Sequence, residues 1–306
     1  MSGQTIAWIL FHVFIVIMLY LDLACFHKEC HVIRIREAVG WSIFWIALAL
    51  IFCAGVWWIE GASQGMQFLS GYLLEKSLSV DNLFVFLLIF SYFKVPGEYQ
   101  HKVLFWGIIG ALFMRAVFIF SGVALIERFG WIMYVFGGFL IFSGFKLFFE
   151  TEKEVDPEKN LAVRAVRKIM PVTSGYEKDH LFVRRDKRLW ATPLFVVLIV
   201  VETTDIIFAI DSIPAVLAVS RDPFIVYTSN IFAILGLRAL YFALAGVMKL
   251  FHYLHYGLGA ILIFVGFKMI ANHHLHISTG TSLAIIGGVL MFSVILSIIL
   301  GKKENH

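Results

Sequence analysis

Long apolar segments of about 20 residues, separated by shorter polar connections, follow one another along almost the whole chain. A helix of about 20 residues crosses the hydrocarbon core of a bilayer and satisfies its own backbone hydrogen bonds there. The pattern therefore predicts an all-α, polytopic membrane protein of about nine transmembrane helices. The nine predicted spans are Ile6–Phe26, Val39–Ile59, Met66–Phe93, Val103–Ile126, Trp131–Phe149, Trp190–Val219, Phe224–Val247, Tyr253–Ala271 and Thr281–Leu300.

The composition agrees with a membrane protein and excludes an ordinary soluble domain. Hydrophobic residues make up 60% of the chain, charged residues 15%, and the mean hydropathy is +0.87, whereas a soluble domain carries about 25% charged residues. The net charge of +4 does not indicate a nucleic-acid partner, because the basic residues are sorted by topology. Cys25, Cys30 and Cys53 form no CxxC pair, so neither a disulfide framework nor a zinc site is expected.

The lysines and arginines indicate the orientation in the membrane. They gather in the connections after spans 1, 3, 5 and 7 and in the C-terminal tail, which predicts an outer N-terminus and a cytoplasmic C-terminus. The first span lacks a basic n-region and a small-residue cleavage site, so we interpret it as an uncleaved helix. The 150–189 connection is rich in both charges, which predicts a mobile cytoplasmic loop with a short amphipathic helix around Leu161–Met170.

Two groups of three spans share the same order of charged residues. EKSLSVDN at 75–82 and DIIFAIDS at 205–212 each hold two acids six residues apart. Each group continues to an intramembrane arginine, Arg115 or Arg238, and then to a span with IFSGFK at 141–146 or IFVGFK at 263–268. Because each group holds three spans, the two groups would cross the membrane in opposite senses, as an inverted repeat of spans 3–5 and 6–8. The chain then divides into two N-terminal helices (1–65), repeat 1 (66–149), the cytoplasmic loop (150–189), repeat 2 (190–271), and the C-terminal helix and tail (272–306).

Charged residues inside the predicted spans need partners, because each costs about 2.5–3.5 kcal/mol at the centre of a membrane helix. The intramembrane acids outnumber the intramembrane bases, and a divalent cation would neutralise the surplus. Carboxylate, amide and hydroxyl oxygens favour Mn²⁺, Mg²⁺ or Ca²⁺ over Cu⁺ or Zn²⁺. The candidate metal ligands are Asp22, Glu75, Asp81, Asn82, Glu202, Asp205, Asp211 and Ser212, and the candidate charge-pairing residues are Lys76, Arg115 and Arg238.

The spacing of the acids raises a geometric difficulty. Six residues turn an α-helix by about 600°, so Asp205 and Asp211 would lie about 120° apart around one straight helix. Pro214 is expected to kink or break span 6 beside Asp211 and to free carbonyl oxygens for coordination. Span 3 has no proline, and there Ser77 and Ser79 indicate a bend. Alternatively, the acids serve two sites or two conformations.

The histidines are weaker ligand candidates. His12 stands alone in span 1, and we interpret it as a packed or lumen-facing residue. The run of His273, His274 and His276 in the last outer loop could capture a metal ion, although short surface runs of histidine are more often simply solvated.

Four segments of the chain resemble the signature segments of one family. They are EKSLSVDNLFVF at 75–86, SYFKVP at 91–96, FAIDSIPAV at 208–216 and TSNIFAILGLRALYF at 228–242, and they resemble the TerC family, most closely its Alx branch. The resemblance extends from span 1 to span 9. It implies an inner-membrane protein linked to manganese export, to metal supply for secreted enzymes and to tellurium resistance. It also implies that the acids of the two repeated helices handle the ion, and Asp22 matches an acid in the family's first helix.

The residues and the resemblance together favour a transporter of a divalent cation, namely manganese efflux from the cytoplasm, without a permanent cofactor. Its partners would be the bilayer, the cation, and protons on the same carboxyls, since no ATP-binding motif is present. An anion such as tellurite fits an acidic site poorly, although a tellurium resistance factor remains an alternative. An intramembrane aspartyl protease is not expected, because neither Asp81 nor Asp211 stands in a GxGD context, and we predict no enzyme activity. A membrane scaffold that assists biogenesis or metallation of exported proteins is the other alternative, with the charges as structural pairs.

Overall fold

The computed structural model of the chain describes residues 3–26, 35–149, 161–185, 188–245, 254–271 and 277–301. The His273–His276 run lies outside these ranges, as do residues 150–160 and the side chains of Asp22 and Asp81. The elements are α1 (Gly3–Phe26), α2 (Ile35–Glu60), α3 (Ala62–Tyr92), α4 (Gly97–Arg128), α5 (Ile132–Phe149), α6 (Leu161–Ile169), β1 (Phe182–Arg185), β2 (Arg188–Ala191), α7 (Pro193–Leu217), α8 (Pro223–Leu235), α9 (Leu237–Ala245), α10 (Leu254–Ala271) and α11 (Thr279–Gly301).

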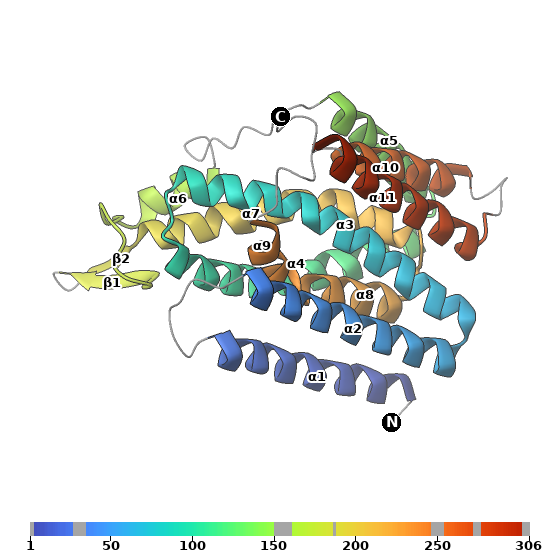
Figure 1. The fold of residues 1–306 in the computed structure, drawn as a ribbon, viewed down its shortest axis with the longest axis horizontal. Coiled ribbons are helices and arrows are strands. Elements are labelled where there is room, and N and C mark those ends of the chain that lie inside the picture. The colour runs from blue at the N-terminus through green and yellow to red at the C-terminus, as the bar shows by residue number, and fades with distance from the viewer. Residues whose placement is uncertain are drawn as a thin grey trace.

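The protein is a bundle of long helices, as its apolar pattern predicts (Figure 1). Within the described ranges, six stretches are long and apolar enough to cross a membrane: α2, α4, α5, α7, the α8–α9 stretch and most of α11. Shorter apolar helices lie in α1 and α10. Large apolar side chains cover the outside of the bundle, with Phe113 69% and Ile51 68% exposed, which suits contact with lipid tails. The chain is therefore a multi-pass membrane protein, while the number of nine spans stays a prediction.

α5 and α10 form the most extensive helix pair and lie beside α11 (Figure 1). Glycines allow their backbones to touch. A Cβ on Gly144 would lie 2.7 Å from the carbonyl oxygen of Gly259, and one on Gly137 would lie 2.9 Å from that of Gly266. Since higher numbers on α5 meet lower numbers on α10, the two helices are antiparallel.

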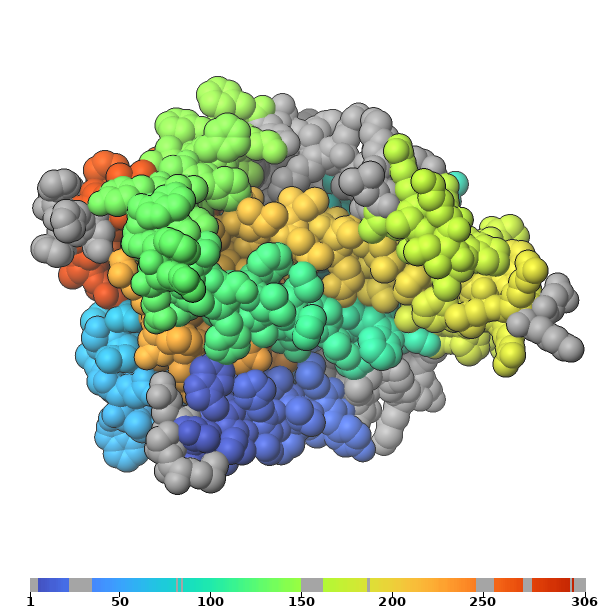
Figure 2. Space-filling model, turned by 180° about the vertical axis from the view of Figure 1, so that it is seen from behind, coloured from blue at the N-terminus to red at the C-terminus, as the bar shows by residue number. Residues whose placement is uncertain are grey.

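α8 is the central helix of the bundle. Every residue from Phe224 to Leu235 is buried, and α8 contacts α2, α3 and α4. Its first turn is capped by Asp222, whose carboxylate accepts hydrogen bonds from the backbone N–H groups of Phe224 at 2.8 Å and Ile225 at 3.3 Å. On the remaining side, α1 lies along α4 and α8 (Figure 2), and the Trp8 ring packs edge to face on Phe224.

The predicted span Phe224–Val247 is divided into two helices, α8 and α9, which meet at Gly236. The Lys76 ammonium lies at this break and donates a hydrogen bond to the carbonyl oxygen of Ala233 at 3.1 Å. A Cβ on Gly236 would lie 2.8 Å from Lys76 Nζ and 3.1 Å from Trp45 Cβ. The sequence predicts one continuous span here. Gly236 barely changes the local hydropathy, and Lys76 comes from a distant part of the chain.

The predicted break at Pro214 is absent, because α7 continues through this residue to Leu217. Pro214 lies in the last turn of the helix, where it removes only one backbone donor and leaves the Ile210 carbonyl without its usual partner. α3 is also continuous past Ser77, whose hydroxyl donates to the carbonyl oxygen of Leu73 at 2.6 Å. Both repeated acid segments therefore lie on unbroken helices.

The 150–189 connection contains more regular structure than its charge pattern predicts. α6 matches the amphipathic helix expected around Leu161–Met170 and buries Val163. β1 and β2 form an antiparallel hairpin that pairs Val183 with Trp190. Trp190, the predicted start of span 6, therefore lies in a strand, and α7 begins at Pro193.

Two side-chain contacts hold this segment to the ends of α3 and α4. The Tyr176 hydroxyl donates to the carbonyl oxygen of Phe93 at 2.8 Å, and burial raises the pKa of Tyr176 to about 12. The Lys102 ammonium donates to Asp179 Oδ2 at 2.7 Å. This hydrogen bond lowers the pKa of the Asp179 carboxyl below its ordinary value of 3.8.

We expect the contribution of Asp179 to docking to be present at neutral pH and to be lost as the pH falls through the lowered pKa of the folded state. Because both partners are partly exposed, the effect is below about 1 kcal/mol and decreases with salt. Hydrogen exchange of residues 173–182 should be faster in Asp179→Asn than in the wild type at pH 7, and the difference should shrink as the pH is lowered until Asp179 is protonated. Equal exchange at pH 7 would contradict this role.

Candidate cation site

Charged side chains of the two repeated segments meet where α3, α4, α7 and α8 come together. Glu75 Oε1 accepts a hydrogen bond from Arg115 Nη1, and Glu75 Oε2 accepts one from Asn230 Nδ2 at 3.0 Å. Arg115 Nη1 also lies 3.0 Å from Ser212 Oγ, and Nη2 lies 3.6 Å from Asp205 Oδ1. One guanidinium therefore joins a carboxylate of α3 to a carboxylate of α7.

This cluster is buried in the bundle. Glu75 and Asn230 are 0% exposed, Arg115 1% and Asp205 6%. On α7 the cluster lies at the boundary between two apolar cores, since Val201 belongs to one core and Ala209 to the other. Buried charges of this kind are tolerated only as pairs, and removal of one partner is strongly destabilising. Removal of Arg115 alone, with nothing to replace its charge, is therefore expected to destabilise the packing of these four helices.

One carboxylate oxygen of the cluster has no donor. Asp205 Oδ2 is buried without a hydrogen-bond partner among the described residues. Asp205 borders a narrow cavity of about 20 Å³, which it shares with Arg238 on α9 and with Gly107 on α4. Such a volume holds about one water molecule. Arg238 is itself 1% exposed, so both repeated arginines lie in the bundle interior, as the cost of lipid exposure predicts.

Glu202 lies one turn before Asp205 on the same face of α7, as their spacing of three residues predicts. It faces α4 at Gly110, where a Cβ would collide with both carboxylate oxygens of Glu202. Gly107, one turn earlier on α4, is different, because a Cβ there would only touch a Val201 methyl group at 3.4 Å. The absence of a side chain at Gly110 makes room for this third carboxyl group.

We expect Gly110→Ala to displace the Glu202 carboxylate and to cost about 1–3 kcal/mol of stability, the usual effect of overpacking. The matched control is Gly138→Ala on α5, where an added methyl group meets no atom within 4 Å. Thermal unfolding in detergent and metal flux in proteoliposomes would be compared for the two variants. Similar behaviour of both would mean that the position of Glu202 is not critical.

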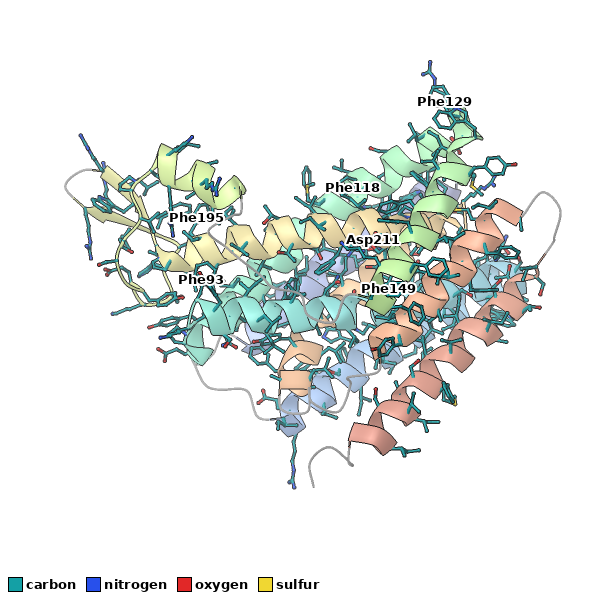
Figure 3. All side chains as sticks on the ribbon, turned by 90° about the horizontal axis from the view of Figure 1, so that it is seen from above. Phe93, Phe118, Phe129, Phe149, Phe195 and Asp211 are labelled. Atoms are coloured by element: carbon teal, nitrogen blue, oxygen red, sulfur yellow. The ribbon has the colours of Figure 1, made fainter. Side chains whose placement is uncertain are left out.

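Asp211 points away from this cluster, toward α5 (Figure 3), where it accepts a hydrogen bond from the Ser143 hydroxyl at 2.8 Å. Asp205 and Asp211 therefore contact different helices, α4 and α5, as an angle of about 120° on an unbroken helix requires. The acids of α7 occupy two positions and not one. Of the repeated acids in α3, Glu75 is in the cluster, and the side chain of Asp81 lies outside the described part of the chain.

Other predicted residues have different surroundings. Asn82 is buried on α3, next to Asp81. The described partner of Lys76 is the Ala233 carbonyl and not a carboxylate. His12 is exposed on α1, donates a hydrogen bond from Nδ1 to the Trp8 carbonyl oxygen at 2.8 Å, and stacks on Tyr227. This agrees with a packing role for His12.

Sequence reasoning missed two residues of the site, Asn230 and Ser143. Asn230 stands in the apolar run SNIFAIL, and a polar amide within a membrane helix needs a buried partner. That signal was available, but it does not identify Glu75 as the partner. Ser143 gave no signal, because a single serine in a membrane helix can bond its own backbone.

Within the described ranges, no three His, Cys, Asp or Glu side chains come together closely enough to hold a metal ion. At the cluster of Glu75 and Asp205, the Arg115 guanidinium lies between the two carboxylates. In the described arrangement, the two carboxylates therefore already bind a positively charged group of the protein, the Arg115 guanidinium.

Comparison with known proteins identifies the family of this chain. The sequence model of one protein family, the integral membrane protein TerC family, matches residues 60–305. The chain belongs to this family. An uncharacterized membrane protein of Myxococcus xanthus is 52% identical over 99% of this chain and 94% of its own length. The putative membrane-bound redox modulators Alx of Salmonella typhi and Escherichia coli K12 are 46% and 45% identical, over 96% of this chain and 94% and 95% of their own lengths. No solved structure matches the chain.

Proposed function

We propose that this protein is not an enzyme but a transporter of a divalent metal cation, most simply manganese leaving the cytoplasm, through the carboxylates of α3 and α7. The observation that carries the proposal is that one cation, the Arg115 guanidinium, bridges Glu75 and Asp205 at the centre of the bundle. A site that binds a guanidinium through two carboxylates has the charge to bind a divalent ion instead.

The chemistry of the neighbouring atoms favours a hard cation. Glu75, Asp205, Ser212 and Asn230 supply carboxylate, hydroxyl and amide oxygens, and Glu202 is one turn away. Mn²⁺, Mg²⁺ and Ca²⁺ prefer such oxygen ligands. Arg115 would have to leave the carboxylates when the ion enters, so binding of the ion and movement of Arg115 are coupled in this proposal.

An inverted repeat would give the site two related halves, and the α5–α10 contact supports this arrangement. IFSGFK and IFVGFK align Gly144 with Gly266, and the preceding residues align Gly137 with Gly259. Gly144 meets Gly259, and Gly137 meets Gly266. This reciprocal contact between antiparallel helices is what a two-fold axis perpendicular to them produces. The same axis would exchange α3 with α7 and α4 with α8. It would therefore relate the contact of α4 with α7 to the contact of α8 with α3, and both contacts are present.

The proposed location is the inner membrane, with the N-terminus outside and the C-terminus in the cytoplasm. The charge asymmetry of the connections supports this orientation. It places α6 and the β-hairpin in the cytoplasm, together with their exposed arginines.

The name of the Alx relatives mentions redox modulation, and a thiol would be the simplest redox group. Cys53, the cysteine whose side chain is described, is buried and donates a long hydrogen bond to the Gly65 carbonyl at 3.4 Å. A buried thiol of this kind is a structural residue, so Cys53 does not favour redox chemistry.

The direct test is uptake of Mn²⁺ into proteoliposomes that contain the purified protein. We expect saturable Mn²⁺ uptake that exceeds the uptake by protein-free liposomes. An excess of Mg²⁺ or Ca²⁺ should inhibit this uptake only if that ion binds at the same site. A parallel assay with a pH-sensitive dye would report whether protons move in exchange. Uptake no faster than in protein-free liposomes, under an imposed Mn²⁺ gradient of either direction, would refute transport and favour the scaffold alternative.

A further inference from the structure

A cavity of about 310 Å³ lies at the end of the bundle where α7 finishes, far from the cation site. Its wall includes Gln67 of α3, Ser220 and Arg221 after α7, Lys268 of α10 and Thr279 of α11. Asp205 lies about 18 Å away along α7, at 1.5 Å per residue. This end of the bundle lies opposite the β-hairpin (Figure 1).

Lys268 is an unusual residue for this position. It is only 7% exposed, yet it makes no hydrogen bond or ion pair with any described residue, and it borders the cavity. A buried ammonium group without a partner is costly, and such groups are normally paired. The missing partner of Lys268 is therefore expected inside the cavity.

A second cation stands at the opening. Arg221 is exposed, and its guanidinium contacts only the Met133 sulfur, at 3.4 Å, among the described residues. The neighbouring carboxylate of Asp222 is engaged in capping α8. No Asp or Glu is among the described residues that line the cavity.

Two helix ends also meet this cavity, and their effects oppose each other. α11 begins at Thr279 and presents the positive end of its dipole, whereas α7 ends at Leu217 and presents a negative end. Each end is equivalent to about half an elementary charge, so the two nearly cancel. The full charges of Lys268 and Arg221 remain, and the wall has a net charge of about +2.

We propose that this cavity binds a phosphate-type oxyanion, held by Lys268 from inside and by Arg221 at the opening. Lysine and arginine both bind phosphate oxygens well, and the Ser220 and Thr279 hydroxyls and the Gln67 amide supply further polar contacts. A volume of 310 Å³ exceeds that of one phosphate group and leaves room for water. The oxyanion is either free phosphate or the phosphodiester of a lipid headgroup.

The repeat provides a natural comparison for Lys268. IFSGFK and IFVGFK place Lys146 at the equivalent position of α5, but Lys146 is exposed and does not border this cavity. The sequence alone therefore predicts the same role for both lysines, whereas the structure separates them. Lys146→Gln is the matched control for Lys268→Gln.

The test uses the full-length protein in nanodiscs of phosphatidylcholine, titrated with inorganic phosphate at constant ionic strength. We expect a saturable rise in the melting temperature of the wild type and of Lys146→Gln. In Lys268→Gln the apparent affinity for phosphate should fall by about tenfold or more, since a charge-assisted contact is lost. Without phosphate, Lys268→Gln should melt at the same temperature as the wild type or higher, because an unpaired buried charge has been removed.

The lipid source is tested in nanodiscs that contain phosphatidylglycerol, with native mass spectrometry to count retained lipids. Retention of phosphatidylglycerol by the wild type but not by Lys268→Gln, without a response to free phosphate, would assign the cavity to a lipid headgroup. If Lys268→Gln does not fold, Arg221→Gln replaces it, because that side chain is exposed, and a weaker response is again expected. Equal phosphate and lipid responses in the wild type and the folded variant would overturn the proposal. None of these measurements involves metal flux, so the result is independent of the proposed transport function.

Discussion

Replacement of Arg115 by Met should make the stability of this protein depend on divalent cations. In metal-free buffer, Glu75 and Asp205 would lose the cation that now joins them, and an uncompensated buried charge costs about 3–5 kcal/mol. A divalent ion could then occupy the vacated position between the carboxylates. At about 100 times its dissociation constant, a ligand that binds only the folded state returns about 2.7 kcal/mol.

The measurement is thermal unfolding of the purified variant in detergent, with EDTA, with Mn²⁺, and with K⁺ at the same ionic strength. Arg128→Gln is the control, because Arg128 is an exposed arginine at the end of the same helix. We expect Arg115→Met to unfold at a lower temperature with EDTA or K⁺ and to recover with Mn²⁺. Destabilisation that Mn²⁺ does not relieve would mean that these carboxylates serve only to hold Arg115, and the transport site would have to be sought elsewhere.

Asp205→Asn should abolish most Mn²⁺ flux while the protein stays folded. Asn keeps the size of the side chain, and Glu75 still neutralises Arg115. A hard cation, in contrast, loses a carboxylate ligand whose second oxygen has no other partner in the described structure. The neutral amide of Asn compensates less well than a carboxylate for the water molecules that the cation gives up when it binds. We expect the affinity of the site for Mn²⁺ to fall about a hundredfold in Asp205→Asn, which corresponds to a loss of about 2.7 kcal/mol of binding free energy.

Asp222→Asn is the matched control for this variant, because it makes the same chemical change outside the site. Asp222 caps α8, and Asn is an equally good capping residue, so flux and melting temperature should both be preserved. Flux through proteoliposomes and thermal unfolding would be measured on the same preparations. Wild-type flux in Asp205→Asn would exclude this carboxylate as a ligand, and a parallel loss of folding would favour a structural ion pair.

The sequence predicts the long helices and the recurrence of the acids well, because both depend on local patterns. Hydropathy alone identifies the apolar segments, and the cost of buried charge predicts that Arg115 and Arg238 avoid lipid. The angle between Asp205 and Asp211 also follows from the geometry of one helix. None of these inferences requires knowledge of the neighbouring helices.

What the sequence could not predict depends on contacts between helices. The space for Glu202 is provided by Gly110 on α4, and the partner of Glu75 includes Asn230 on α8. The break at Gly236 accompanies a lysine that is 160 residues earlier in the chain. Pro214 does not break α7, because a proline costs little in the last turn of a helix, where few hydrogen bonds remain to be lost.

The enclosure of α8 has a consequence for biosynthesis. This helix emerges from the ribosome after α2, α3 and α4, the helices that it contacts in the folded protein. Since all residues from Phe224 to Leu235 are buried by protein, the final environment of Thr228, Ser229 and Asn230 is not lipid. The earlier helices must therefore remain apart, or open again, until α8 has been inserted between them. A nascent chain that ends before Pro223 therefore lacks the helix around which α2, α3 and α4 pack. The proteases that degrade misfolded membrane proteins would have to spare this incomplete state during synthesis.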